Sequence, residues 1–275
     1  MSYTPNEFLN GYNGKILRIN LSDRKITKES IPQDVYADCV GGTGLGARFL
    51  LNDVKSDVKW DSSNNRLMFM LGPLNGLPLS GAGAVSILSK GPMTNGIGSS
   101  QSNGFFGAFL KTAGYDGIII EGTASCWVYL YIDNDEIKIM DAKHLVGLDT
   151  WTTETEIKKE LGEKRLSVRC IGPCGENLIR FAGILGDAGH SSSHNGLGAV
   201  MGSKKLKAIA VRQGKYKSKI SDFERVKELF SEMVNTSLTG KRRYRHEYGT
   251  AGSYVDQYLK GTLPIKNYTQ RCPVK

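Results

Sequence analysis

The segment His190-Ser-Ser-Ser-His-Asn-Gly-Leu-Gly-Ala-Val-Met-Gly202 is the last of four glycine-rich stretches that organise this chain. The earlier ones are Gly41-Gly-Thr-Gly-Leu-Gly46, Ile97-Gly-Ser-Ser-Gln-Ser-Asn-Gly-Phe-Phe-Gly107 and Ile171-Gly-Pro-Cys-Gly-Glu-Asn177. Glycine has no Cβ and accepts positive φ, so backbone at such places can approach a ligand closely. Exposed backbone N–H groups then form anion-binding concavities. Because each stretch is joined to a strand-like run, the pattern predicts a site for a large polar ligand.

The elements around these stretches are strands up to residue 212 and helices afterwards. Helices are expected to begin near Ala47, to span 105–113 and 152–161 (the latter with a Thr cap), to run from a cap at Asp222 to about Thr236, and to span 254–259. Apolar or alternating runs predict strands over 15–21, 66–71, 84–89, 117–121, 127–132, 136–140, 167–171 and 207–211. The turn Ser22-Asp-Arg-Lys25 is expected to lead into a partner strand for 15–21.

These elements predict an α+β fold with mixed β-sheets. Strand, hairpin and glycine-rich loop recur in both halves of residues 10–212, which is compatible with an internal pseudo-two-fold repeat. We expect residues 1–212 to form one domain. Residues 213–275 are expected to form a linker, with the boundary in 213–221, and the start of a helical second domain.

Composition narrows the class of protein. The 275 residues, 40% hydrophobic, can bury a sizeable core, and no apolar run approaches the roughly 18 residues of a membrane helix. The N-terminus lacks the basic and apolar regions of a signal peptide, so a cytoplasmic location is expected. Five cysteines at irregular spacing argue against a disulfide framework. The Cys170 and Cys174 pair cannot supply the four thiolates of an iron–sulfur cluster, and structural thiols are expected.

The net charge of +9 is unevenly distributed. No acidic residue lies between Asp187 and Asp222, and a second basic cluster is Lys241-Arg-Arg-Tyr-Arg245. Such clusters fit either an acidic protein partner or an ordinary solvated face, and the sequence leaves both open. Aromatic residues that could stack on bases are sparse, so no nucleic-acid partner is expected. The first cluster comprises Lys204, Lys205, Lys207, Arg212, Lys215, Lys217 and Lys219.

The sequence matches the common nucleotide-binding and zinc-binding motifs poorly. Gly42, Gly44 and Ala47 match the dinucleotide-binding pattern, but no clear buried strand precedes them. His190 and His194 lie in a Ser/Gly loop without neighbouring carboxylates or thiolates, which favours hydrogen bonding over zinc. No catalytic acid, base or nucleophile is assigned.

The glycine-rich segments resemble, in their order and amino-acid sequence, those of the N-terminal domain of the tungsten-containing aldehyde:ferredoxin oxidoreductase family. That family includes the active-site subunit of tungsten-type benzoyl-CoA reductase. The resemblance covers residues 11 to 212, and its most specific segments are Ala113-Gly-Tyr-Asp116 and Gly198-Ala-Val-Met-Gly-Ser-Lys204. Further matching segments are Gly14–Leu21, Gly72-Pro-Leu-Asn-Gly76, Lys90–Gly98 and Asn103-Gly-Phe-Phe-Gly107.

The resemblance implies that this domain cradles a tungsten bis-pterin cofactor, with molybdenum as the alternative metal. A Mg²⁺ ion that bridges the two pterin phosphates is also implied, with Gln101 and Ser192 as its ligands. The [4Fe–4S] cluster of the complete enzyme would have its ligands outside this chain. The implied cofactor-binding residues are Ala82, Gln101, Ser102, Asn103, Gly104, Ser191, Ser192, Ser193, His194, Asn195 and Gly196.

This chain departs from the aldehyde-oxidising members at several of those positions. Ala82 replaces an Arg, Gln101 an Asn, and His190–Gly196 the segment Arg-Ala-Ala-Gly-Arg-Gly-Gly. Arg forms bidentate phosphate clamps and stays charged, whereas a substitute such as His194 titrates near neutrality. The Ser-rich loop is closer to the benzoyl-CoA reductase branch.

The expected function is that of the cofactor-binding part of a tungstopterin oxidoreductase. It would oxidise aldehydes to carboxylic acids, or the reverse, with electrons passing through a [4Fe–4S] cluster to ferredoxin. The alternatives are part of an aromatic acyl-CoA reductase active-site subunit and a non-catalytic assembly subunit that has lost the cofactor. Expected partners are ferredoxin or an iron–sulfur subunit, the C-terminal remainder of the enzyme or a complementing subunit, and a second copy of the chain.

Overall fold

A computed structural model describes residues 10–270 of the chain. Cys272 and the N-terminal residues that were compared with a signal peptide lie outside this range. The chain divides into two compact units, Met1–Ser221 and Asp222–Lys275. No helix within the described range is long and apolar enough to cross a membrane.

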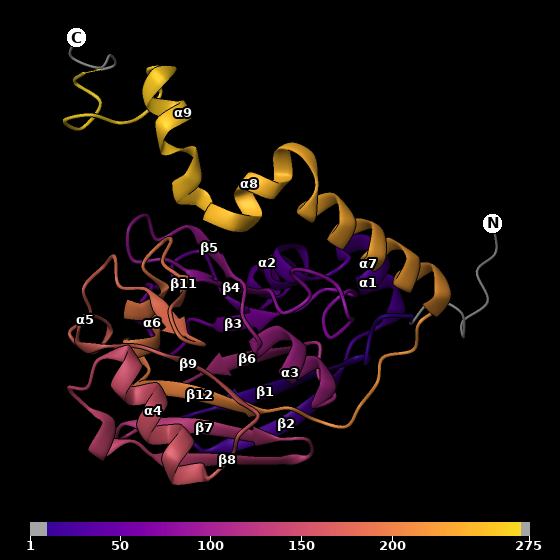
Figure 1. Ribbon diagram of the computed structural model, residues 1–275. Coiled ribbons are helices and arrows are strands. Elements are labelled where there is room, and N and C mark those ends of the chain that lie inside the picture. The colour runs from indigo at the N-terminus through magenta and orange to yellow at the C-terminus, as the bar shows by residue number, and fades with distance from the viewer. Residues whose placement is uncertain (1–9, 271–275) are drawn as a thin grey trace. The chain divides into compact units, whose positions relative to one another are not determined.

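The first unit contains two six-stranded sheets (Figure 1). The order of the first is β2-β1-β6-β3-β4-β5, and that of the second is β11-β10-β9-β12-β7-β8. The first sheet comprises β1 (Lys15–Asn20), β2 (Lys25–Ser30), β3 (Leu67–Met70), β4 (Val85–Lys90), β5 (Ile97–Ser102) and β6 (Gly117–Glu121). The second comprises β7 (Val128–Asp133), β8 (Glu136–Asp141), β9 (Leu166–Cys170), β10 (Ile184–Gly186), β11 (His190–Ser192) and β12 (Leu206–Arg212).

The two sheets repeat one topology. Each begins with an antiparallel hairpin, β1–β2 or β7–β8. The last strand of each repeat then pairs in parallel with the first, as β6 with β1 and β12 with β7. The remaining three strands add antiparallel neighbours. The α+β class, the mixed sheets and the internal two-fold repeat expected from the sequence are therefore confirmed.

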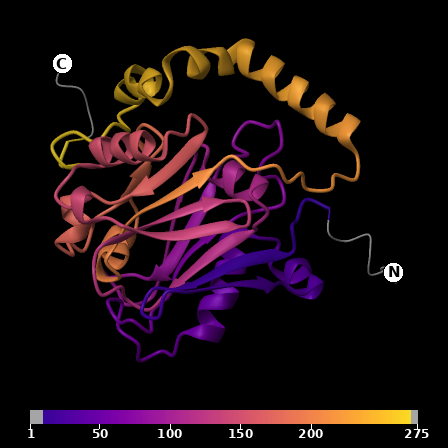
Figure 2. The ribbon, with the colours of Figure 1, turned by 90° about the horizontal axis from the view of Figure 1, so that it is seen from below.

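Three apolar clusters fill the spaces on either side of the sheets. The largest takes alternate residues from both sheets together with α3 (Phe106–Thr112) and α6 (Leu197–Ser203). The outer face of the first sheet packs on α1 (Gln33–Cys39) and α2 (Gly42–Asp53), and that of the second on α4 (Thr150–Leu161). In Figure 2 the indigo and purple helices α1 and α2 lie on the opposite side of the strands from the pink helix α4.

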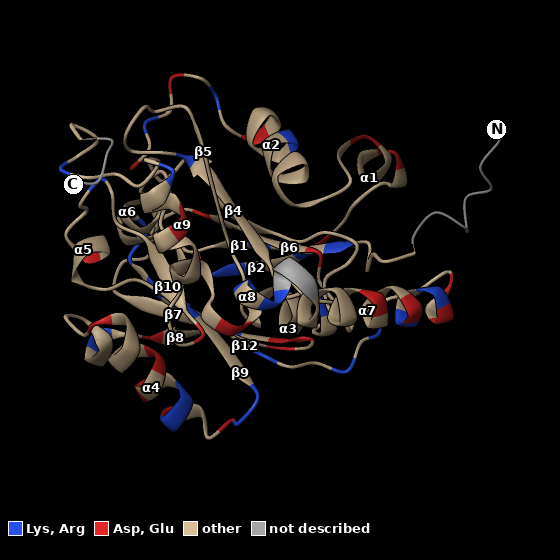
Figure 3. Cartoon of the chain, turned by 45° about the horizontal axis from the view of Figure 1, so that its top comes forward, with Lys and Arg blue, Asp and Glu red and all other residues tan. Residues whose placement is uncertain are grey.

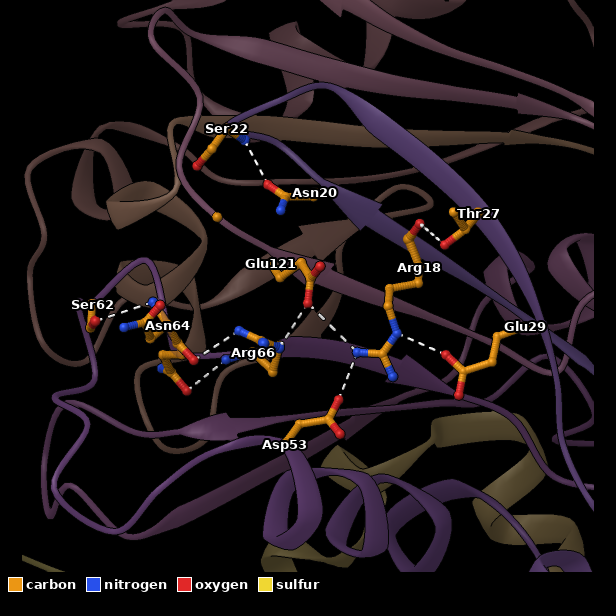
Figure 4. Close-up of polar contacts among 12 residues, drawn as sticks. Arg18, Asn20, Ser22, Thr27, Glu29, Asp53, Ser62, Asn64, Arg66 and Glu121 are labelled. Atoms are coloured by element: carbon orange, nitrogen blue, oxygen red, sulfur yellow. Dashed lines mark hydrogen bonds and ion pairs between the residues drawn. The ribbon is translucent and has the colours of Figure 1, made fainter.

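An ion network fixes α2 on the outer face of the first sheet (Figure 4). Arg18 of β1 pairs with Asp53 at the end of α2, at 2.6 Å, and with Glu29 of β2, at 2.8 Å. Glu121 of β6 lies 3.6 Å from Arg18 and 3.0 Å from the Nε of Arg66. The glycine-rich start of α2 is held separately, because the Gly42 amide donates to the Leu71 carbonyl at 2.8 Å.

Two local expectations were wrong. The first glycine-rich stretch is not a loop before a helix at Ala47, because α2 already begins at Gly42. The cap of α4 is Asp149, whose carboxylate accepts the Thr152 amide at 2.8 Å, and not a threonine. The sequence did not predict α1, β5, α5 (Pro173–Glu176), β10, β11, α6 or α8 (Gly240–Tyr248).

The second unit is helical. It contains α7 (Phe223–Leu238), α8 (Gly240–Tyr248) and α9 (Tyr254–Leu259), with a 3₁₀ turn at Thr250–Ser253. Asp222 caps α7 by accepting the Arg225 amide at 2.9 Å, as expected from the sequence. No residue of α7 is buried.

Candidate functional site

The two repeats bring equivalent loops together. One loop joins β5 to α3, and the other joins β11 to α6. At the last residue of each strand, the buried hydroxyl of Ser192 donates to that of Ser102, at 2.8 Å. The His194 amide also donates to Ser100 Oγ, at 3.1 Å, and Asn195 Nδ2 to the Ser99 carbonyl, at 2.7 Å. The segments predicted to bind one cofactor therefore meet at the junction of the two sheets.

A cavity of about 500 Å³ opens beside this junction. Ala82, Asn103 and Gly104, all predicted site residues, lie in its wall, and so does His190. Six of its eleven lining residues are Gly, Ala or Ser, and none is Asp or Glu. A Cβ on Gly81 would meet nothing within 4 Å, so the cavity is open there. Such a wall suits an anionic group, because no carboxylate opposes its charge. The remaining lining residues are Leu77, Leu79, Ser80, Gly83, Phe105 and Ala108.

Gly104 is required by the packing of the protein itself. Its φ is +112°, and a Cβ there would lie 2.5 Å from Asp187 Oδ2 and 2.8 Å from Arg169 Nη2. A Cβ on Gly83 would likewise lie 1.7 Å from the Gly104 carbonyl. These glycines let one loop press against another, so a glycine-rich stretch alone did not reveal which backbone faces a ligand.

A second cavity has a volume of about 380 Å³. The glycine-rich start of α2 lines it together with Gln101, whose Nε2 donates to Thr43 Oγ1 at 3.3 Å. Val40, at its edge, has a φ of +58°, which is unfavourable for a β-branched residue. This cavity wall also contains no Asp or Glu.

The predicted metal ligands have different surroundings. Gln101 lines the smaller cavity, whereas Ser192 is fully buried against Ser102. Within residues 10–270, no group of three or more His, Cys, Asp or Glu side chains could hold a metal ion. The assignment of Gln101 and Ser192 to Mg²⁺ stays a prediction. Of the other predicted residues, Ser191, Ser193 and His194 are exposed, and Gly196 precedes α6 with a φ of +66°.

Sequence reasoning missed Arg169 and Asp187. Both are buried and lie directly behind the wall of the larger cavity. The available signal was a charged residue within the apolar strand Leu166-Ser-Val-Arg-Cys170. The thiol expectation holds at Cys170, where burial raises the pKa to about 12 and so keeps the thiol protonated.

Several residues of the first basic cluster are buried or paired with carboxylates in the folded chain. Lys204 and Lys207 are fully buried, and Arg212 pairs with Asp133 at 2.8 Å and Glu163 at 3.0 Å. Outside this cluster, α4 and α7 each carry both acidic and basic residues (Figure 3). The cluster therefore offers a partner fewer cations than its sequence indicates.

Comparison with known proteins identifies the family. The model of the family described as "Aldehyde ferredoxin oxidoreductase, N-terminal domain" matches residues 16–213. The chain belongs to this family. The aldehyde ferredoxin oxidoreductase resemblance stated from the sequence is thus confirmed.

Relatives of the aldehyde ferredoxin oxidoreductase family are similar over nearly the whole chain. The tungsten-containing aldehyde ferredoxin oxidoreductase of Pyrococcus abyssi is 40% identical over 262 residues, which cover 94% of this chain and 43% of the relative. The aliphatic sulfonate oxidoreductase, WOR-like subunit, of Pyrococcus furiosus is 35% identical over 277 residues, with the same coverage. The chain therefore spans less than half the length of these relatives.

A solved structure shares the fold. It is the active site complex BamBC of benzoyl coenzyme A reductase in complex with 1,5-dienoyl-CoA. The TM-score is 0.81 at 35% identity, and the match covers 86% of this chain and 35% of the other.

Proposed function

We propose that residues 1–212 form the cofactor-binding domain of a tungsten bis-pterin oxidoreductase, and that residues 213–275 begin its helical second domain. The observation that carries this proposal is the convergence of the two equivalent strand-to-helix loops at the Ser102–Ser192 contact. A cofactor with two similar halves suits a site built from two similar repeats. The tungsten-containing relatives support the choice of metal, with molybdenum as the alternative.

The cavity walls fit the phosphate ends of such a cofactor. Backbone around Gly81–Gly83 and Asn103–Gly104 would hold one end. His190 of the other repeat lines the same cavity, and the loop Ser191–Gly196 that follows it would contribute. Gln101, which lines the smaller cavity, would supply an oxygen ligand to a Mg²⁺ ion, and Ser192 would supply another on leaving its contact with Ser102. When bound, the cofactor would supply two-electron oxidation of an aldehyde to a carboxylic acid, or the reverse, with electrons leaving through a [4Fe–4S] cluster.

A second candidate is part of an aromatic acyl-CoA reductase active-site subunit. The similarity to the benzoyl coenzyme A reductase complex favours it. The Ser-rich sequence of residues 190–196 supports it too, since fixed positive charges are absent there. A complex with electron-transfer subunits would accompany this activity, whereas ferredoxin would serve the first.

The test is to produce the chain together with the remainder of its enzyme and to measure W, Mo, Fe and pterin per chain. Metal with about two pterins per assembly is expected. Reduction of an aromatic acyl-CoA without oxidation of aldehydes would select the second candidate. A folded complex with neither metal nor pterin would overturn both and leave a non-catalytic assembly subunit.

A further inference from the structure

Arg169 is a buried cation on the inner face of the second sheet. Its neighbours in β9, Val168 and Cys170, belong to the outer core beside α4. Side chains alternate along a strand, so Arg169 points between the two sheets. It is fully buried. Removing a guanidinium from water is costly unless other groups compensate it.

The first repeat shows that the fold does not need a charge at this position. Ile118 of β6 pairs with Phe69 of β3, and Ile209 of β12 pairs with Arg169 of β9. Both isoleucines face the core between the sheets, and so does Phe69. An aromatic side chain therefore fills in one repeat the place that Arg169 fills in the other. This contrast calls for a role of Arg169 beyond packing.

The contacts of Arg169 lead to both walls of the larger cavity. Its Nη1 donates to the carbonyl of His190, at 2.9 Å, and its Nη2 donates to the carbonyl of Asn103. His190 and Asn103 line the cavity, and they come from different repeats. The Nε of Arg169 has no hydrogen-bond partner among the described residues. The planar fork of arginine can bond two carbonyls at once, which a lysine ammonium cannot do with the same geometry.

Asp187 links Arg169 to the loop between β5 and α3. Its carboxylate lies 3.4 Å from Arg169 Nη2 and accepts the amides of Phe105, at 2.8 Å, and Phe106, at 3.2 Å. The hydroxyl of Ser167 donates to it as well, at 2.7 Å. A residue of the second repeat thus holds the loop of the first.

We propose that Arg169 is a positioning residue that fixes the separation of the two cavity walls, so that an anionic ligand is held by both repeats at once. The inference rests on the proposed function, since it takes the pterin phosphates to be that ligand. Arg169 is fully buried, so it acts through the backbone of Asn103 and His190.

The experiment compares Arg169→Lys with Arg165→Lys in the complex of the chain with the remainder of its enzyme. Arg165 precedes the same strand and is exposed, and its Nη1 donates to Gln213 Oε1 at 3.1 Å. Amide hydrogen exchange is measured at Phe105 and Phe106, at residues 190–192, and at β1 and β7 as references, since neither strand pairs with β9. Tungsten and pterin are measured before and after gel filtration.

Arg169→Lys is expected to speed exchange about tenfold in both walls, with β1 and β7 unchanged, and to release pterin during filtration. Arg165→Lys should do neither. Unchanged exchange in the walls, or equally faster exchange in β1 and β7, would overturn the proposal, since the second result would indicate a purely structural role.

Two further outcomes are informative. If Arg169→Lys does not fold, Asp187→Asn replaces it. It should speed exchange most at Phe105 and Phe106, whose acceptor is changed, and less at residues 190–192, because Arg169 loses its counter-charge. Failure of both variants to fold would overturn the proposal. Wild-type protein without metal or pterin would refute the proposed function, while the exchange pattern would still decide the role of Arg169.

Discussion

Asp116 is a fully buried carboxylate that fastens the start of the first repeat to its end. It accepts from Lys111 Nζ at 2.6 Å, from the Tyr36 hydroxyl at 2.6 Å and from the Gly14 amide at 2.8 Å. Asp116→Asn leaves the Lys111 ammonium buried without a counter-charge. We expect a loss of about 3–5 kcal/mol in the free energy of unfolding, measured by urea denaturation.

The matched control for Asp116→Asn is an exposed pair of the same unit. Glu136 pairs with Lys138 at 2.6 Å, and both side chains are at least half exposed. Glu136→Gln should cost less than about 1 kcal/mol. Equal losses in the two variants would contradict the importance given to burial.

Lys204 should make stability depend on pH. Burial lowers its pKa to about 7, and its Nζ donates to the carbonyls of Asn65, at 2.7 Å, and Gly122, at 3.1 Å. In the unfolded chain the pKa returns to about 10.4. Between these values only the unfolded state holds the proton, so stability rises with pH. Below pH 7 both states are protonated and this contribution is constant.

Lys204 should make the free energy of unfolding rise by about 1.4 kcal/mol per pH unit between about pH 8 and about pH 9.5. Lys204→Met should remove this rise from the pH dependence of urea denaturation. Lys205→Met is the control, because Lys205 lies nearer the surface with its Nζ on the Ser125 carbonyl. An unchanged slope in Lys204→Met would show that the folded state keeps the proton throughout this range.

At the scale of elements, strands with strong apolar patterns were predictable and short polar ones were not. Phe106–Thr112 and Tyr254–Leu259 follow the predicted helices closely. By contrast, β11 is only His190–Ser192, and its pairing with β10 depends on tertiary structure. The period of a three-residue polar strand carries too little signal to be recognised. Hence the sequence located the second loop without showing that a strand leads into it.

The cap at Asp222 should control the start of α7. The helix has no buried residue, so local interactions contribute most of its stability. Asp222→Ala removes the acceptor for the Arg225 amide and should destabilise the helix by about 1 kcal/mol. Amide exchange in the first turns of α7 should accelerate about fivefold. Ser221→Ala, which removes a neighbouring hydroxyl outside the cap, should leave exchange unchanged.

At the scale of the whole first unit, the two repeats share one topology but differ in their buried ion pairs. Asp116 precedes β6 and pairs with Lys111, whereas Lys207 in the corresponding part of β12 pairs with Glu176 of α5. The faint sequence echo between the halves was therefore enough to indicate a repeat, but not which buried charges would differ. Arg169 was missed for the same reason, since its role depends on loops that are distant in sequence.

The shared core predicts that the two repeats unfold together. The largest apolar cluster contains Leu17 and Phe69 of the first repeat and Leu130 and Ile209 of the second, all fully buried. Leu17→Ala should cost about 2–5 kcal/mol. Because both repeats complete this one core, the loss should lower the urea midpoint for β9 as much as that for β3.

Pulsed hydrogen exchange read by mass spectrometry follows the two strands separately in the same sample. Leu51→Ala, at a side chain that is 73% exposed, should move neither midpoint. A shift confined to β3 would mean that the repeats are independent folding units. In that case the Ser102–Ser192 junction would have to be formed by docking of two folded halves, because no common core would align the strands that carry it.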